Sequence, residues 1–170
     1  MSRLPAFLRM KSIPFNITGF FWHKKDMPPD GPSLRWLKKS VYPFCQQCGY
    51  DVLGESEATT TSTYDCIFIA KKDHHFILLS NIYYGQIGFL RGDSRPFIET
   101  SYMPPESTRF IDLTDLAELL RYIPGIHVWD AEALNTVPQR SMLVSWRDKD
   151  ADHVLSYKTR LGQIIFNDDD

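Results

Sequence analysis

The stretch YDCIFIAKKDHHFILLSNIYYGQIGFL, residues 64–90, decides the fold class of this chain. It contains two apolar runs, at 66–70 and 76–79, and a polar segment at 71–75 lies between them. Short apolar runs separated by a few polar residues are typical of a β-hairpin. Strands joined this closely must run antiparallel, because a parallel connection needs about a dozen residues or more. The stretch therefore predicts the centre of an antiparallel sheet.

Further strands are expected on both sides of this hairpin. The run Ile82 to Leu90 is apolar, but Gly85 and Gly88 interrupt it and indicate a turn or a bulge. Pro96 to Tyr102 fits an edge strand, where a proline is tolerated. The other stretches with strand composition are Ile17 to Trp22 and three that would form a meander, Met142 to Trp146, Val154 to Tyr157 and Gln163 to Phe166.

Helical spacing appears twice. A basic amphipathic helix is expected to begin after Ser33, a suitable N-cap, and to end at Pro43. A second helix is expected after Asp112 or Thr114, either of which can cap it, and before Pro124. The remaining expected elements are a helical turn at Asp130 to Leu134, a proline-rich loop at Asp26 to Pro32, a polar loop at Gly54 to Thr63, and polar turns at Asp148 to Asp152 and Thr159 to Gly162.

These elements predict an α+β fold. We expect a single globular domain over residues 1–170, with a mainly antiparallel sheet of about six or seven strands and two or three helices. Residues 1–14 would form a loosely ordered arm and residues 168–170 a frayed tail. The composition, 43% hydrophobic and 24% charged, is that of a folded protein and excludes disordered and collagen-like classes. At 14%, aromatic residues are numerous enough for a substantial core.

Compartment and membrane association follow from the cysteines and the apolar runs. Three cysteines cannot close a disulfide framework without leaving one over, which favours a reducing compartment. No stretch approaches the roughly 18 apolar residues of a membrane span. Arg9 and Lys11 interrupt the apolar residues at the start of the chain, unlike a signal peptide. A cytoplasmic protein with no membrane partner is therefore expected.

The net charge of −2 conceals an uneven distribution. Residues 1–49 carry eight bases and two acids, whereas residues 93–170 carry eight bases and fourteen acids. A whole-chain nucleic-acid binder would be strongly basic, so nucleic-acid binding is unlikely and would have to use the basic first third. The acidic second half is suited to a basic protein partner, because complementary potentials steer association.

Two motifs resemble metal sites without completing one. Cys45 and Cys48 form a C-x-x-C-G turn, which is half of a zinc knuckle. The other zinc ligands would have to be Cys66 or a histidine. The spacing of these residues leaves open whether they complete a zinc site with Cys45 and Cys48. The alternating acids Asp148, Asp150 and Asp152 open like a calcium loop, but the required glycine and glutamate are missing. No metal and no cofactor are predicted.

Catalysis has candidate residues but no complete set. His127 or His153 with a nearby carboxylate could serve a small hydrolase or nuclease, and Cys45 or Cys66 could supply a thiol. No phosphate loop, dinucleotide fingerprint or nucleophile elbow accompanies them. An enzyme is therefore the alternative, and no catalytic residue is assigned.

The favoured function is a non-enzymatic inhibitor or regulator that binds a basic protein through an acidic face containing aromatic residues. Small bacterial immunity proteins, which neutralise a cognate toxin, share this general character, although no motif places the chain among them. Aromatic residues would anchor the partner and carboxylates would steer it. The candidate contact residues are Glu99, Tyr102, Glu106, Asp130, Asp148, Asp150 and Asp152.

Overall fold

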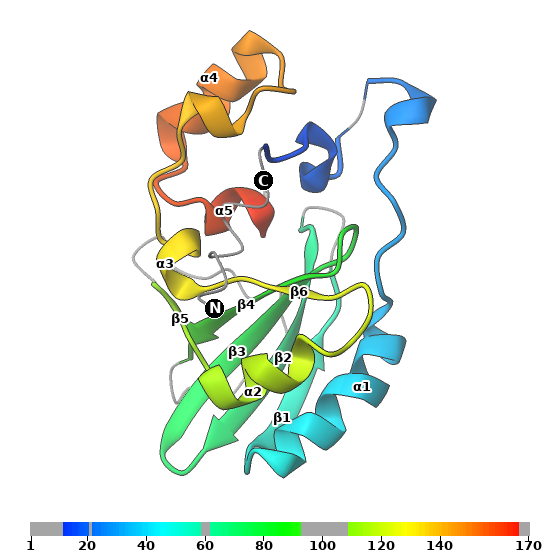
Figure 1. The fold of residues 1–170 in the computed structure, drawn as a ribbon, viewed down its shortest axis with the longest axis vertical. Helices are drawn as coiled ribbons and strands as arrows, with labels where there is room; N and C mark the ends of the chain where they lie inside the picture. The colour runs from blue at the N-terminus through cyan, green and yellow to red at the C-terminus, as the bar shows by residue number, and fades with distance from the viewer. Residues whose placement is uncertain (1–11, 21, 59–61, 93–108, 167–170) are drawn as a thin grey trace, which may run out of the picture.

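The computed structural model describes residues 12–20, 22–58, 62–92 and 109–166, and shows an α+β fold. Its one sheet has six strands, mostly antiparallel, in the order β1-β2-β3-β4-β5, with β6 parallel to β4 (Figure 1). None of the helices described is long and apolar enough to cross a membrane. The strands are β1 (Asp51–Ser56), β2 (Tyr64–Lys71), β3 (His74–Asn81), β4 (Gln86–Arg91), β5 (Phe110–Ile111) and β6 (His127–Val128).

The predicted hairpin is confirmed as the centre of the sheet. Strands β2 and β3 pair without interruption from Tyr64 opposite Asn81 to Lys71 opposite His74. The connection is a tight turn at Lys72 and Asp73, shorter than the predicted polar segment 71–75, because both histidines are part of β3. The hairpin therefore places its polar tip at one end of the sheet and the start of β2 at the other.

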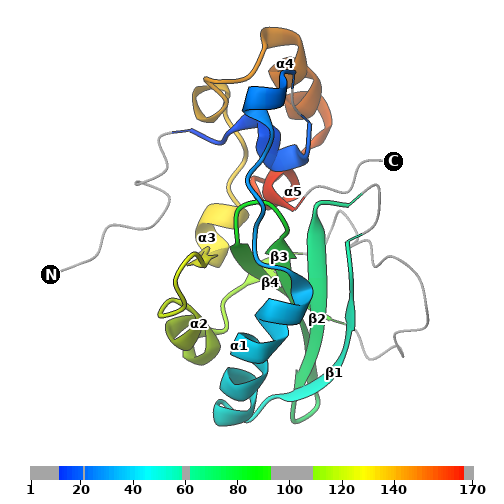
Figure 2. The same ribbon diagram turned by 90° about the vertical axis from the view of Figure 1, so that its right-hand side faces the viewer.

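Both faces of the sheet are covered, which explains why β2 is apolar at nearly every position. The helices α1 (Leu34–Gln47) and α2 (Thr114–Leu120) lie on one face (Figure 2), and Ile67, Ile69 and Leu78 belong to the core beneath them. On the other, Phe68 and Leu79 join a second core made with four helical elements. These are η2 (Phe15–Thr18), α3 (Ala131–Leu134), α4 (Asp148–Tyr157) and α5 (Gly162–Ile165). The two remaining short helices are η3 (Lys24–Asp26) and η4 (Arg140–Met142).

The first helix is longer than predicted, because Pro43 lies inside it. Pro43 and Lys39 both lie on the exposed side of the helix, where water can satisfy the Lys39 carbonyl that loses its helical donor. The buried stripe continues through Val41 to Cys45 and holds the helix on the sheet. The helix ends where the Tyr50 amide donates to the Cys45 carbonyl at 2.8 Å.

The last third of the chain is helical, and the predicted meander is wrong. Met142 to Trp146, Val154 to Tyr157 and Gln163 to Phe166 contribute to η4, α4, α5 and their connections. Asp148 to Asp152 begins α4 rather than forming a polar turn. In α4, Ala151 and Val154 are buried at helical spacing, and Asp148 and Asp150 lie in the first turn, where the helix dipole favours acids.

The predictions for the remaining short segments have mixed outcomes. In the predicted strand Ile17 to Trp22, η2 covers the beginning, and the described residues of the stretch form no strand. The predicted loop Gly54 to Thr63 begins inside the edge strand β1. The expected caps Asp112 and Thr114 do not cap α2, and the Asp112 carboxylate instead accepts from the Ala131 amide at 2.8 Å. The helical turn at Asp130 to Leu134 is confirmed as α3. Pro96 to Tyr102 lies outside the described residues.

Candidate binding site

A proline-rich segment, residues 27–33, runs from η3 to the start of α1 and passes the turn between β3 and β4; we call it the proline strap. The Gly31 amide donates to the Ile82 carbonyl at 2.9 Å. A Cβ atom at Gly31 would lie 2.4 Å from that carbonyl oxygen, so the approach requires glycine. The strap is therefore fixed to the sheet by backbone contact.

The loop after α2 meets the same β3–β4 turn from another side. The His127 amide donates to the Gly85 carbonyl at 3.0 Å. Gly85 has a φ of +61°, and a Cβ atom there would lie 2.4 Å from the Gly125 carbonyl oxygen. Three chain segments that are distant in sequence are thus held together by close backbone packing, which makes the space between them preformed.

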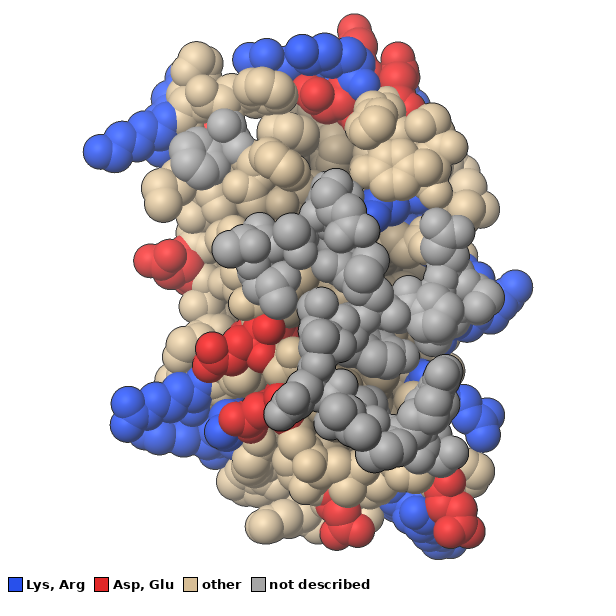
Figure 3. Space-filling view, turned by 180° about the vertical axis from the view of Figure 1, so that it is seen from behind, with Lys and Arg blue, Asp and Glu red and all other residues tan. Residues whose placement is uncertain are grey.

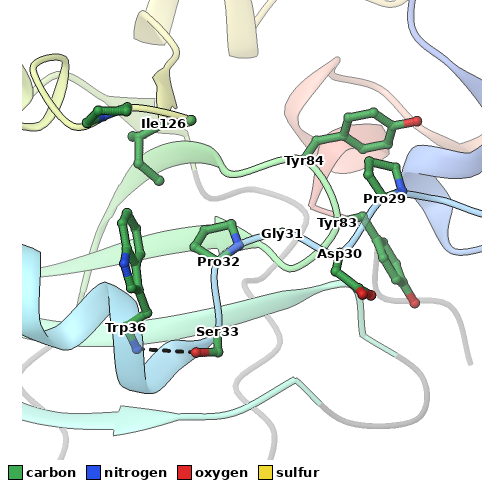
Figure 4. A pocket seen from close by; sticks show the side chains of 11 residues that line it. Pro29, Asp30, Gly31, Pro32, Ser33, Trp36, Tyr83, Tyr84 and Ile126 are labelled. Atoms are coloured by element: carbon green, nitrogen blue, oxygen red, sulfur yellow. Dashed lines mark hydrogen bonds between the residues drawn. The ribbon is translucent and has the colours of Figure 1, made fainter.

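That space is a pocket of about 610 Å³ (Figure 4). Its lining includes the exposed Trp36 of α1 and the consecutive residues Tyr83 and Tyr84 of the β3–β4 turn. The Ser33 hydroxyl accepts from the Trp36 amide at 3.3 Å, as the predicted N-cap should, and so positions the first turn of α1. The remaining lining residues are Pro29, Asp30, Gly31, Pro32, Pro124, Gly125 and Ile126.

The pocket is aromatic and carries one charge. Asp30 is the charged side chain among the described lining residues, and no ion pair within the described part of the chain involves it. The Tyr84 hydroxyl donates to the Asn16 side-chain oxygen, and burial raises the pKa of Tyr84. No lysine or arginine belongs to the described lining. Such a lining suits a cation or an apolar group and disfavours an anion.

The described acids among those predicted to bind a partner do not belong to the described lining of this pocket. Asp130 precedes α3 and accepts from Arg121 at 2.8 Å. Asp148 pairs with Arg140, and it lies on α4 with Asp150 and Asp152. On the face seen in Figure 3, outside the grey atoms, acidic side chains are scattered among basic ones. Glu99, Tyr102 and Glu106 lie outside the described residues.

The structure separates the predicted thiol nucleophiles. Cys45 belongs to the core beneath α1 and α2, whereas Cys66 belongs to the core on the opposite face of the sheet. Burial raises the pKa of the Cys45 thiol to about 12, which is the opposite of an activated thiolate. Cys48 is the C-cap of α1. Within the described ranges, no group of three or more His, Cys, Asp or Glu side chains could hold a metal ion.

The two histidines lie on different elements. His127, in β6, stacks edge-on against Trp129 with 5.0 Å between ring centroids. Burial, reinforced by the charge of Arg121, lowers the pKa of His127, and Asp130 partly opposes this. His153 lies on α4 beside Tyr157. Neither histidine belongs to the described lining of the pocket.

Sequence reasoning identified the strap as a loop and Ser33 as a cap, but it did not identify the pocket. The available signal was the run of prolines before α1 and the pair Tyr83-Tyr84 beside Gly85. Neither pattern indicates that the other lies next to it. Comparison with known proteins adds no relative: no family model, no curated protein and no solved structure matches this chain.

Proposed function

We propose that this protein is a non-enzymatic inhibitor or regulator that binds a basic partner protein, in the manner of an immunity protein and its toxin. The observation that carries the proposal is the preformed aromatic pocket with the carboxylate of Asp30 in its lining. Interface hot spots are concentrated in such pockets, where an anchoring side chain loses its water.

The charge of the pocket supports a basic partner. Asp30 has no cation of its own among the described residues, so a lysine or arginine from another protein would gain a pairing without breaking one. The more distant acids Asp130, Asp148, Asp150 and Asp152 remain proposed contributors to steering. Their field acts on the rate of encounter more than on the final contact.

The arrangement of the catalytic candidates supports binding over hydrolysis. A hydrolase would need a nucleophile or activated water, a base and an orienting acid at one place. Here the two buried thiols lie on opposite faces of the sheet, and the two histidines lie on different elements outside the pocket lining. The pocket instead offers aromatic surface and one carboxylate, which is the chemistry of recognition.

The test begins with the full chain, tagged and recovered from its native cell at physiological salt. Any stoichiometric partner is identified, purified and titrated against the wild type and Trp36→Ala. Tyr122→Ala is the matched control, because Tyr122 is an exposed aromatic residue, 83% accessible, that does not belong to the pocket lining.

We expect a basic partner whose binding is weakened at least about tenfold by Trp36→Ala and left unchanged by Tyr122→Ala. Recovery of no stoichiometric partner would contradict the proposal. So would a partner that is acidic, or hydrolytic activity that depends on His127.

A further inference from the structure

The pocket has two chemically different ends. In Figure 4, Trp36, Pro32 and Ile126 are drawn toward one end, and Asp30, Pro29 and Tyr83 toward the other. The first end is apolar, and the second joins a carboxylate to an aromatic ring. A volume of about 610 Å³ is larger than one side chain needs and matches a small-ligand site. The occupant should therefore carry a cation next to an apolar group.

We infer that the pocket receives an arginine side chain of the partner together with a neighbouring apolar side chain of the same segment. The inference rests on the proposed function, and it names the element of the partner that this site recognises. The guanidinium would lie at the Asp30 end, and the apolar side chain would pack at the Trp36 and Ile126 end.

Arginine fits this lining better than lysine for two reasons. Its planar guanidinium stacks on aromatic faces, and its paired N–H groups match the two oxygens of a carboxylate. It is also more weakly hydrated than an ammonium group, so less hydration is lost on entering an aromatic pocket. The negative faces of the aromatic rings add attraction for either cation.

The rigidity of the pocket favours recognition of a short segment. The strap and the loop after α2 are each pressed against the β3–β4 turn at a glycine, so the walls are set before the ligand arrives. A preformed site avoids the conformational cost of ordering loops on binding. A single arginine with one apolar neighbour can therefore bind measurably without the rest of the partner.

The experiment titrates the full chain with the blocked dipeptide acetyl-Leu-Arg-amide while the indole N–H signals are followed by NMR. We expect the Trp36 signal to shift with a Kd on the order of 1 mM, while the Trp22 signal stays in place, because Trp22 lies outside the pocket lining. Acetyl-Leu-citrulline-amide has the same shape without the charge, and acetyl-Leu-Lys-amide carries a different cation.

Substitutions test which residues of the pocket contact the dipeptide. Asp30→Asn should raise the Kd about threefold, a modest change because Asp30 is exposed. Asp26→Asn is the matched control, an exposed carboxylate at the start of the same region that does not line the pocket, and it should leave the Kd unchanged. Ile126→Ala should weaken binding of the Leu-Arg dipeptide more than binding of acetyl-Gly-Arg-amide.

Each outcome decides one of the two proposals. Binding of the citrulline or lysine dipeptide as tight as that of the arginine dipeptide would overturn the inference, as would an unmoved Trp36 signal. A recovered basic partner that binds Asp30→Asn and Trp36→Ala as well as the wild type would also overturn it; binding of a basic partner would then stand, but not at this pocket. Binding of the arginine dipeptide without any cellular partner would support the arginine chemistry of the pocket and contradict the proposed function.

Discussion

The two faces of the sheet are covered in different ways. On the face of α1 and α2, helices of 14 and 7 residues present continuous apolar stripes to Ile67, Ile69 and Leu78. On the opposite face, α4 has ten residues, but α3 and α5 have only four each and η2 is a single 3-10 turn. Helices this short are unstable by themselves, so their positions must be fixed by something beyond their own hydrogen bonds.

Buried side-chain hydrogen bonds supply that fixation. Asn81, fully buried at the end of β3, donates to the carbonyls of Ile17 at 3.2 Å and Ile165 at 2.7 Å, and so joins η2 to α5. The Trp146 indole donates to the Ile13 carbonyl at 2.8 Å. The face of α1 and α2 thus rests on the apolar stripes of two helices, whereas the opposite face adds buried polar anchors to its apolar core. Substitutions on the two faces should consequently differ in their effects on stability and on hydrogen exchange.

The largest effect is expected on the face covered by α1 and α2. Leu37→Ala removes a fully buried side chain from the α1 stripe and should lower the free energy of unfolding by about 2–5 kcal/mol. Urea unfolding followed by circular dichroism measures it, and α1 and the sheet should unfold together. Arg35→Ala, at an exposed position of the same helix, should change stability by less than about 0.5 kcal/mol. An equal loss from both variants would show that α1 is not held by its apolar stripe.

The next largest loss of stability should be confined to the opposite face, where Asn81 joins η2 to α5. Asn81→Ala leaves two buried carbonyls and the amides of Tyr83 and Tyr84 without this partner, at a cost of about 2–3 kcal/mol. Hydrogen exchange should accelerate in α5 before it does in α1.

Ser80→Ala is the control for the Asn81 substitution. Ser80 is buried beside Asn81, and its hydroxyl has no hydrogen-bond partner among the described residues, so its loss should change stability by less than about 0.5 kcal/mol. Uniform exchange across α1 and α5 in Asn81→Ala would contradict the distinction between the two faces.

Acid should lower the stability of the protein through His127, which stacks on Trp129. Burial holds the pKa of His127 below its ordinary 6.5, so below about pH 6.5 the unfolded chain binds a proton that the folded chain does not. Stability should be constant above that pH and should fall on acidification until the folded-state pKa is reached. The slope from this residue is at most about 1.4 kcal/mol per pH unit. Urea midpoints at several pH values measure it, and His127→Gln should lose that part of the slope.

The smallest effect concerns the aromatic stack near α4. The Arg147 guanidinium lies 3.7 Å from the centroid of the Trp22 ring. The ring of Phe15 also stacks on Trp22, with 5.5 Å between the ring centroids. Arg147→Ala should cost about 0.5–1 kcal/mol in thermal unfolding. Lys149→Ala should cost less, because its ammonium lies 5.7 Å from the same ring. A reversed order would show that the contact contributes nothing specific.

The parts of the fold that could be predicted are those set by neighbours in sequence. The hairpin 64–81 has its apolar runs and its polar turn adjacent, so local pattern was enough. The end of α1 could not be predicted, because a proline inside a helix is tolerated on its exposed side, and which side is exposed depends on where the sheet packs. Val154 to Tyr157 has strand composition, yet burial of Ala151 and Val154 together makes it helical.

Spacing, turn length and proline chemistry act over a few residues, and they were sufficient to predict the α+β class, the antiparallel core and the loop nature of the proline strap. The pocket forms only when the chain folds, because Trp36, Tyr83 and Ile126 come from three distant segments. The tertiary structure also decided that Cys45 and Cys66 serve separate cores. The physical reason is that contacts between distant segments depend on how faces pack and on where a glycine lets two backbones approach, and neither is visible in local periodicity.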